Sequence, residues 1–148
     1  MNKFNLGVLL IAFIILGSCG KKNTTVNNNV PYVYVSIQVF KSLSENTYLA
    51  TPGTYKYLTG GYKGIILAHT LDDKYLAFDR TCTFHPETSC AIIELDSATF
   101  NNYYCGKKTN HCCDSRYQAD GFVVNGPATQ PLKSYNVSQD ANYIYITN

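Results

Sequence analysis

The stretch that decides the fold is residues 112–135, CCDSRYQADGFVVNGPATQPLKSY. It begins with two adjacent cysteines, passes through a Ser-Arg-Tyr triplet at 115–117 and reaches a short apolar run that opens at Gly121. A Gly-Pro-Ala turn signal at 126–128 follows, and the stretch closes on Tyr135. Turn residues so close together leave room only for short strands, which predicts β-structure for this part of the chain.

The same alternation of short β-rich runs and turn signals is found on both sides of this stretch. The first run, YVYVSIQVF at 32–40, is β-branched and aromatic, and Thr-Pro-Gly at 51–53 breaks the chain after it. Comparable runs are found at 55–58, 64–69, 75–79, 91–95, 122–124 and 143–147. No window of a dozen residues shows sustained helical periodicity. The pattern predicts an all-β fold, an antiparallel sandwich or barrel.

The first residues have the three-part layout of a secretory signal. Lys3 supplies a positive charge, residues 6–16 form an apolar run, and Leu-Gly-Ser-Cys follows at 16–19. The run is shorter than the about 20 residues that a membrane-spanning helix needs. Leu-Gly-Ser-Cys resembles the lipobox of bacterial lipoproteins, whose cysteine thiol receives diacylglycerol. We therefore expect a signal peptide at 1–18 and a lipid on Cys19, which anchors the chain to a membrane of the cell envelope.

The residues after the lipid-bearing cysteine divide into a tether and one domain. Residues 19–30 are mostly lysine, threonine and asparagine, so they bury too little apolar surface to fold. Residues 31–148 have the length of one domain. The full chain has 12 basic and 10 acidic residues, and the signal removes only Lys3. The nearly neutral mature chain has no basic stripe for a phosphate backbone, so nucleic acid is not expected as a partner.

A second cysteine-bearing stretch, AFDRTCTFHP, lies at residues 77–86. Together with residues 112–135 it resembles the paired cluster-binding loops of Rieske iron–sulfur domains, and the Gly-Pro-Ala, Pro-Leu and tyrosine spacing is the most specific part. Residues 60–67, GGYKGIIL, are similar to the strand that leads into the family's first loop. The resemblance implies a Rieske-like antiparallel β-fold with a small loop-bearing β-subdomain.

The ligand pattern departs from that of the family. Its usual pattern is Cys-x-His in loop one and Cys-x-x-His in loop two, and these four residues hold a 2Fe-2S cluster. Cys82 matches the first cysteine, but Phe84 stands at the histidine position and His85 comes one residue later. Asn110 and Cys113 stand at the two ligand positions of loop two. The resemblance thus implies a degenerate cluster site, and no cofactor is the leading expectation.

The resemblance also implies a pairing of the remaining cysteines. Many respiratory Rieske proteins have a second cysteine in each loop, and the two form a disulfide. Cys112 falls at that position in loop two, and Cys90, displaced by a few residues, is its counterpart. If the cluster space is empty, Cys82 and Cys113 face each other and form a second disulfide, which leaves Cys105 as a free thiol or a ligand.

These observations lead to one main hypothesis for the function and two alternatives. We expect a non-catalytic structural or binding module on the membrane, with an envelope protein or a redox partner. The first alternative is a 2Fe-2S electron-transfer protein with non-standard ligands, drawn from Cys82, His85, Cys105, Cys112 and Cys113. The second is zinc or another metal held by Cys82, His85, Cys112 and Cys113. Nothing resembles a nucleophile elbow, an acid pair or a phosphate loop, so a stand-alone enzyme is not expected.

Overall fold

The computed structural model describes residues 29–148 except 97–98, 100–101 and 108–109. The predicted signal at 1–18, Cys19 and the tether up to residue 28 lie outside the described residues. The last two residues of the predicted tether belong to the folded part, because Val30 is buried and the Asn29 amide donates to the Thr83 carbonyl at 3.0 Å. Among the described residues, no helix has the length and apolar character to cross a bilayer.

Strands make up nearly all of the regular structure in the described residues. They are β1 (Ser36–Phe40), β2 (Thr54–Leu58), β3 (Ile65–His69), β4 (Tyr75–Asp79), β5 (Ile93–Leu95), β6 (Asn102–Lys107), β7 (Asn110–Gln118), β8 (Val123–Asn125), β9 (Ser134–Gln139) and β10 (Tyr143–Thr147), with one short 3-10 helix, η1 (Thr47–Ala50). Three of them, β6, β7 and β9, were not among the runs predicted from the sequence.

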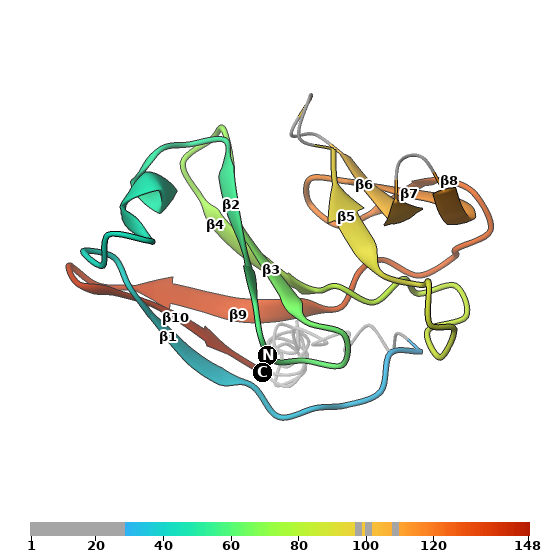
Figure 1. The fold of residues 1–148 in the computed structure, drawn as a ribbon, viewed down its shortest axis with the longest axis horizontal. Helices are drawn as coiled ribbons and strands as arrows, with labels where there is room; N and C mark the ends of the chain where they lie inside the picture. The colour runs from blue at the N-terminus through green and yellow to red at the C-terminus, as the bar shows by residue number, and fades with distance from the viewer. Residues whose placement is uncertain (1–28, 97–98, 100–101, 108–109) are drawn as a thin grey trace, which may run out of the picture.

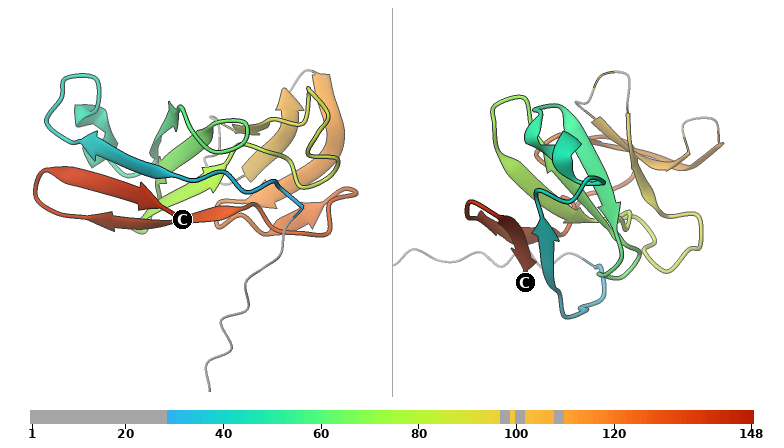
Figure 2. Two further views of the ribbon diagram at one scale, coloured as in Figure 1. Left: turned by 90° about the horizontal axis from the view of Figure 1, so that it is seen from below. Right: turned by 60° about the vertical axis from the view of Figure 1, so that its left-hand side comes forward.

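The strands form two antiparallel sheets. The larger has six strands in the order β1-β10-β9-β4-β3-β2, and the smaller has four in the order β5-β6-β7-β8. The chain enters the smaller sheet after β4 and returns to the larger sheet at β9, and the two sheets lie toward opposite ends of the long axis (Figures 1 and 2). The prediction of an all-β antiparallel fold with a small β-subdomain is confirmed.

Strand β3, which lies between β4 and the edge strand β2, faces a separate hydrophobic core on each of its sides. All five of its residues are buried, because alternate side chains of a strand point to opposite faces. Ile65 and Leu67 pack into a core within the larger sheet. Ile66 points the other way and packs, with Phe78 of β4, into a core that is otherwise built from the smaller sheet and its loops. The smaller sheet and its loops therefore pack against the face of β3 and β4 that carries Ile66 and Phe78.

A buried carboxylate fixes the point where β4 leaves the larger sheet. Asp79 is fully buried, and its oxygens accept hydrogen bonds from the backbone N–H groups of Tyr62 (2.7 Å), Lys63 (3.4 Å) and Thr81 (3.1 Å). The hydroxyls of Thr81 and Tyr135 also donate to it, the latter at 2.8 Å. A buried charge needs such partners. Asp79 thereby ties the turn after β2, the end of β4 and strand β9 together, three residues before the first cysteine of the site.

Candidate functional site

The loop that follows β4 folds back on itself and presents Cys82 to the interior. Thr81 forms an antiparallel bridge with Ile92, and the Cys82 N–H donates to the Ala91 carbonyl at 3.1 Å. Residues 83–90 are thus closed at their base by backbone pairing. This pairing holds the Cys82 side chain, which has no exposed surface, in the core beneath the smaller sheet.

A bulge in β7 brings two more thiols to the same point. The pairs Tyr104↔Arg116 and Gly106↔His111 bracket a register shift, so residues 112–115 of β7 lie opposite the single residue Cys105 of β6. A bulge of this kind re-aims side chains locally. Cys105 points inward and is fully buried, while Cys113 is half-buried.

The three sulfurs of Cys82, Cys105 and Cys113 form a cluster, which we call the thiol trio. Each Sγ lies within 4.8 Å of the other two, and the Cys82 and Cys113 sulfurs are 3.7 Å apart. That separation is far from the about 2.05 Å of a disulfide bond. The second predicted disulfide, Cys82 with Cys113, is therefore wrong for this structure. The physical reason is the third thiol, since Cys105 occupies the same contact and Cys82 is shared between both neighbours.

Cys90 and Cys112 are joined by a disulfide, with Cα atoms 5.4 Å apart. This is the pair that the resemblance implied. It links the loop after β4 to the bulge of β7 at the surface side, where Cys90 is exposed. Because its sulfur is bonded to Cys90, Cys112 has no thiolate to offer a metal, which removes it from both ligand sets considered above.

His85 does not approach the trio either. Its side chain is 64% exposed, and its Nδ1 lies 3.5 Å from a Glu87 carboxylate oxygen on the outside of the loop. Phe84 has the opposite orientation, because its ring is half-buried and packs against the core that contains Cys82. Of the five candidate metal ligands, the structure brings together Cys82, Cys105 and Cys113, and it leaves out His85 and Cys112.

Hydroxyl groups from two segments surround the Cys82 sulfur. The Tyr117 hydroxyl lies 3.4 Å from Cys82 Sγ and accepts the Thr83 N–H at 3.2 Å. The Thr83 hydroxyl donates to the Gln130 carbonyl at 2.7 Å, so its oxygen, 2.9 Å from the Tyr117 oxygen, is an acceptor there. The Tyr117 proton is therefore free to point at the Thr83 oxygen or at the Cys82 sulfur.

Hydrogen bonding within the trio shifts the pKa values of two of its thiols in opposite directions. The Cys105 thiol and then the Tyr117 hydroxyl donate toward Cys82, which lowers the pKa of the Cys82 thiol to about 6 despite burial. The pKa of Cys105 is raised, because its proton is held by Cys82 and the group is removed from water. Cys82 thus ionises before Cys105.

The bulge that holds Cys113 is braced from behind by the segment after β8. The Cys113 thiol donates to the Ser115 hydroxyl oxygen at 3.1 Å, and that oxygen also accepts the Ala128 N–H at 3.1 Å. Gly126 has a φ of +88°, and a Cβ there would overlap the Asp114 backbone. A glycine is needed for both reasons, which explains the Gly-Pro-Ala signal in physical terms.

Sequence reasoning named Cys105 only as a free thiol or one of five candidate ligands, and it missed Tyr117 as a member of the site. A signal for Cys105 was present: a hairpin centred between Lys107 and Asn110, which are paired in the structure, places Cys105 opposite the two adjacent cysteines. Tyr117 carried no separate signal, because a tyrosine in a strand is most often a packing residue. Its role depends on the loop after β4 passing over β7.

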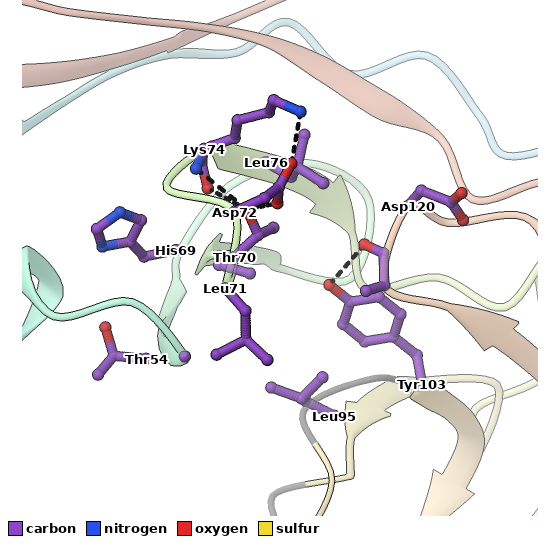
Figure 3. A pocket seen from close by; sticks show the side chains of 13 residues that line it. Thr54, His69, Thr70, Leu71, Asp72, Lys74, Leu76, Leu95, Tyr103 and Asp120 are labelled. Atoms are coloured by element: carbon purple, nitrogen blue, oxygen red, sulfur yellow. Dashed lines mark hydrogen bonds and ion pairs between the residues drawn. The ribbon is translucent and has the colours of Figure 1, made fainter.

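A cavity of about 510 Å³ lies between the two sheets, away from the cysteines. Leu71, Leu76 and Leu95 line it together with Tyr103 (Figure 3). Its polar groups already have protein partners, since Asp72 accepts from Lys74 and Thr70, and the Tyr103 hydroxyl donates to the Ala119 carbonyl at 3.4 Å. The thiol trio, with its weaker partners, is the stronger candidate for chemistry.

Comparison with known proteins shows similarity at the level of structure. No family model matches the chain, and no curated protein matches it in a sequence search. The plasma membrane Rieske protein PetC3 from the cyanobacterium Synechocystis PCC 6803 superposes with a TM-score of 0.56 and 17% sequence identity, over 76% of this chain and 99% of that one. The ferredoxin of carbazole 1,9a-dioxygenase from Nocardioides aromaticivorans IC177 gives a TM-score of 0.48 and 15% identity, over 78% and 98%. The superposition on PetC3, together with the element order described above, shows that the chain has a Rieske-like fold, strongly divergent in sequence.

Proposed function

From this Rieske-like fold, we propose that the chain is a membrane-anchored module whose cluster position is filled by its own side chains. In this proposal it serves as a structural or binding module in the cell envelope and does not carry electrons on a 2Fe-2S cluster. The observation that carries the proposal is the orientation of two neighbouring side chains in loop one, Phe84 and His85. Phe84, which stands where the family has a histidine ligand, packs into the core, while His85 faces solvent.

The donor set does not fit the family's cluster. A Rieske cluster uses two cysteines on one iron and two histidines on the other, and other 2Fe-2S clusters use four cysteines. In the part of the chain that the structure describes, the residues that meet are three thiols, with no histidine among them. The Tyr117 hydroxyl and the close Cys82–Cys113 contact further fill the space between the loops. We therefore derive no electron transfer through this site.

In this proposal the Cys90–Cys112 disulfide, and not a metal cluster, holds the two loops together. Cys90 and Cys112 are 22 residues apart, and cross-linking them restricts the unfolded chain by about 3 kcal/mol in the loop-entropy model. An oxidising compartment outside the cytoplasm keeps such a bond. The pairing thus agrees with an envelope location, and it keeps the loops together without a metal.

The membrane anchor is proposed from the first 19 residues alone. A signal whose apolar run is too short to span, followed by Leu-Gly-Ser-Cys, supports lipidation of Cys19. The test is detergent-phase partitioning of the full chain and of Cys19→Ser. We expect the wild-type chain in the detergent phase and the variant in the aqueous phase, and a variant that still enters the detergent phase would overturn the anchor.

The missing cluster is tested by composition. The full chain is purified without oxygen from iron-replete cells, and iron and acid-labile sulfide are measured alongside the visible spectrum. We expect less than about one iron per ten chains, taking this as the level of contamination, and no absorption above 400 nm of the kind a 2Fe-2S cluster gives. Two irons and two sulfides per chain would support electron transfer with non-standard ligands instead.

A further inference from the structure

We propose that the thiol trio of Cys82, Cys105 and Cys113 is a binding site for a single Cu(I) ion. The inference goes beyond the proposed function. It rests on the absence of a 2Fe-2S cluster in that proposal, because such a cluster would occupy the same thiols. It concerns the three free thiols, of which the loop resemblance places Cys82 and Cys113 at ligand positions and assigns no position to Cys105. The three come from the loop after β4, from β6 and from β7, so the fold, and not one local motif, assembles them.

The sulfur positions match what a small ion between three thiolates requires. An ion about 2.3 Å from each sulfur, which is the Zn–S distance, holds three coplanar sulfurs about 4.0 Å apart. In the structure the Cys82 and Cys113 sulfurs are 3.7 Å apart, and all three lie within 4.8 Å of one another. Only small side-chain shifts separate this arrangement from a trigonal site.

The number and kind of donors select Cu(I) among the thiophilic ions. Thiolates prefer Cu(I), zinc and iron–sulfur clusters over harder ions. Structural zinc is almost always bound by four ligands, and in the described residues the trio has no fourth cysteine, histidine or carboxylate within reach. Cu(I) is a d10 ion that is stable with three thiolates in a plane. The count of three sulfurs therefore fits Cu(I) and leaves zinc one ligand short.

The surroundings of the trio suit an ion that must be shielded from water on one side. Cys82 and Cys105 have no exposed surface, and they share a hydrophobic core with Phe78 and Tyr103. Cys113 is half-buried and provides the side from which an ion enters. A dry interior and a single open edge slow the loss of Cu(I) and limit its oxidation by dissolved oxygen.

Outer-shell hydrogen bonds are already in place for a thiolate at Cys82. The Tyr117 hydroxyl, 3.4 Å from Cys82 Sγ, accepts the Thr83 N–H, and its own proton points at the sulfur or at the Thr83 hydroxyl oxygen 2.9 Å away. On the other side of the site, the Ser115 hydroxyl lies 3.1 Å from Cys113 Sγ. Such partners orient metal ligands and stabilise their charge. Binding of Cu(I) releases the thiol protons to solvent, so no oxidant or reductant takes part in it.

The test is an anaerobic titration of the full chain, purified without metal, with Cu(I) supplied as its bicinchoninate complex. We expect one Cu(I) per chain to be withdrawn from the coloured complex, with a sharp end point. A tenfold excess of Zn(II) should leave the Cu(I) in place. If no Cu(I) is withdrawn, or if Zn(II) displaces it, the Cu(I) site is overturned.

Two variants separate the trio from other ligands. Cys113→Ser removes the most accessible thiol and should weaken Cu(I) binding by more than about 100-fold, since outer-shell changes alone are worth about 10- to 100-fold. His85→Gln is the matched control, because His85 lies nearby, can bind metals and faces away from the trio. It should change the affinity less than about threefold, which is well below the effect of an outer-shell partner. Equal affinity in Cys113→Ser and wild type would contradict the assignment.

A second measurement remains informative if Cys113→Ser does not fold. The wild-type chain is alkylated with iodoacetamide, with and without one equivalent of Cu(I), and each cysteine is quantified by mass spectrometry after denaturation. Cu(I) should protect Cys82, Cys105 and Cys113 together, and the disulfide-bonded pair should stay unmodified in both samples. Protection of none or of only one of the three would overturn the site. Iron and sulfide measured on the same preparation report separately on whether the proposed function has failed.

Discussion

Two buried polar clusters lie only three residues apart in the sequence, and they differ in how their groups are satisfied. Asp79 has five donors from the protein, three of them backbone N–H groups, around a single carboxylate. The thiol trio has three sulfurs that mainly contact one another, with one hydroxyl beside Cys82 and one beside Cys113. The hydrogen-bonding groups of the first cluster are all paired within the protein, whereas the sulfurs of the second can still bind a ligand.

The difference separates a structural site from a candidate functional one. A buried carboxylate with a full set of donors holds chain segments in place. Removing either the carboxylate or its donors leaves a buried polar group without a partner. Buried thiols are weak donors and acceptors, so they tolerate being unpaired and remain available for a soft ion. The substitutions below test this contrast, beginning with the largest expected effect.

Replacing the central carboxylate should be the most damaging change. Asp79→Ala leaves the buried Thr81 N–H and Tyr135 hydroxyl without their acceptor, so we expect a loss of about 3 to 5 kcal/mol in the free energy of unfolding. The matched control is Asp140→Ala. Asp140 also accepts from two backbone N–H groups and a tyrosine hydroxyl, but it is exposed. Urea unfolding should show a far smaller loss in the control. Equal losses would break the contrast between the two clusters.

The disulfide should stabilise the fold by about 3 kcal/mol, and the trio should add no second cross-link. We expect the double variant Cys90→Ser/Cys112→Ser to lose this amount in chemical denaturation. A reducing agent should destabilise the wild type by a similar amount and leave the double variant unchanged. Further destabilisation of the double variant by the reductant would reveal a disulfide within Cys82, Cys105 and Cys113, contrary to the free thiols of the structure.

The brace behind the bulge should be sensitive to a single methyl group. Gly126→Ala combines a positive φ, which costs about 1 to 2 kcal/mol, with overlap of the Asp114 backbone, so the total should exceed about 2 kcal/mol. Gly53→Ala is the control, because its φ is +84° but its Cβ would meet only the Leu71 side chain, at 3.2 Å. It should show the conformational effect alone. Thiol alkylation at Cys113 should become faster in Gly126→Ala and not in Gly53→Ala.

The smallest expected effect concerns the hydroxyl beside Cys82. Tyr117→Phe leaves the Thr83 N–H without its acceptor, which should lower stability by about 1 to 2 kcal/mol while the ring still fills the core. Tyr145→Phe, whose hydroxyl binds Asp140 at the surface, is the control and should be less affected. A Tyr117→Phe variant as stable as the wild type would show that its hydroxyl contributes nothing to holding the loop over β7.

The sequence predicts the larger sheet better than the smaller one. Strands β3 and β4 are continuous apolar runs because both of their faces are buried, so composition alone indicates them. Strands β6 and β7 mix polar residues, cysteines and tyrosines and lack alternation. They are strands because they pair with each other across a hairpin, and this is a tertiary effect that no single window contains.

The site shows the same limit. The pairing of Cys90 with Cys112 follows from the loop resemblance, because Cys112 stands at the family's position and Cys90 is displaced from its position by only a few residues. The place of Cys105 depends on the bulge in β7, where four residues lie opposite one, and sequence spacing does not encode that register. The outward turn of His85 likewise depends on its positive φ of 52°, a conformation that sequence alone does not reveal for a non-glycine residue.

The most direct test of the central claim is a crystal structure of the full mature chain, grown from anaerobically purified protein, with anomalous data collected above and below the iron absorption edge. The account predicts no iron peak between the loops, the Phe84 ring in the core and the Cys82 and Cys113 sulfurs close together. A pair of iron peaks between these two cysteines, with His85 turned inward as a ligand, would contradict it.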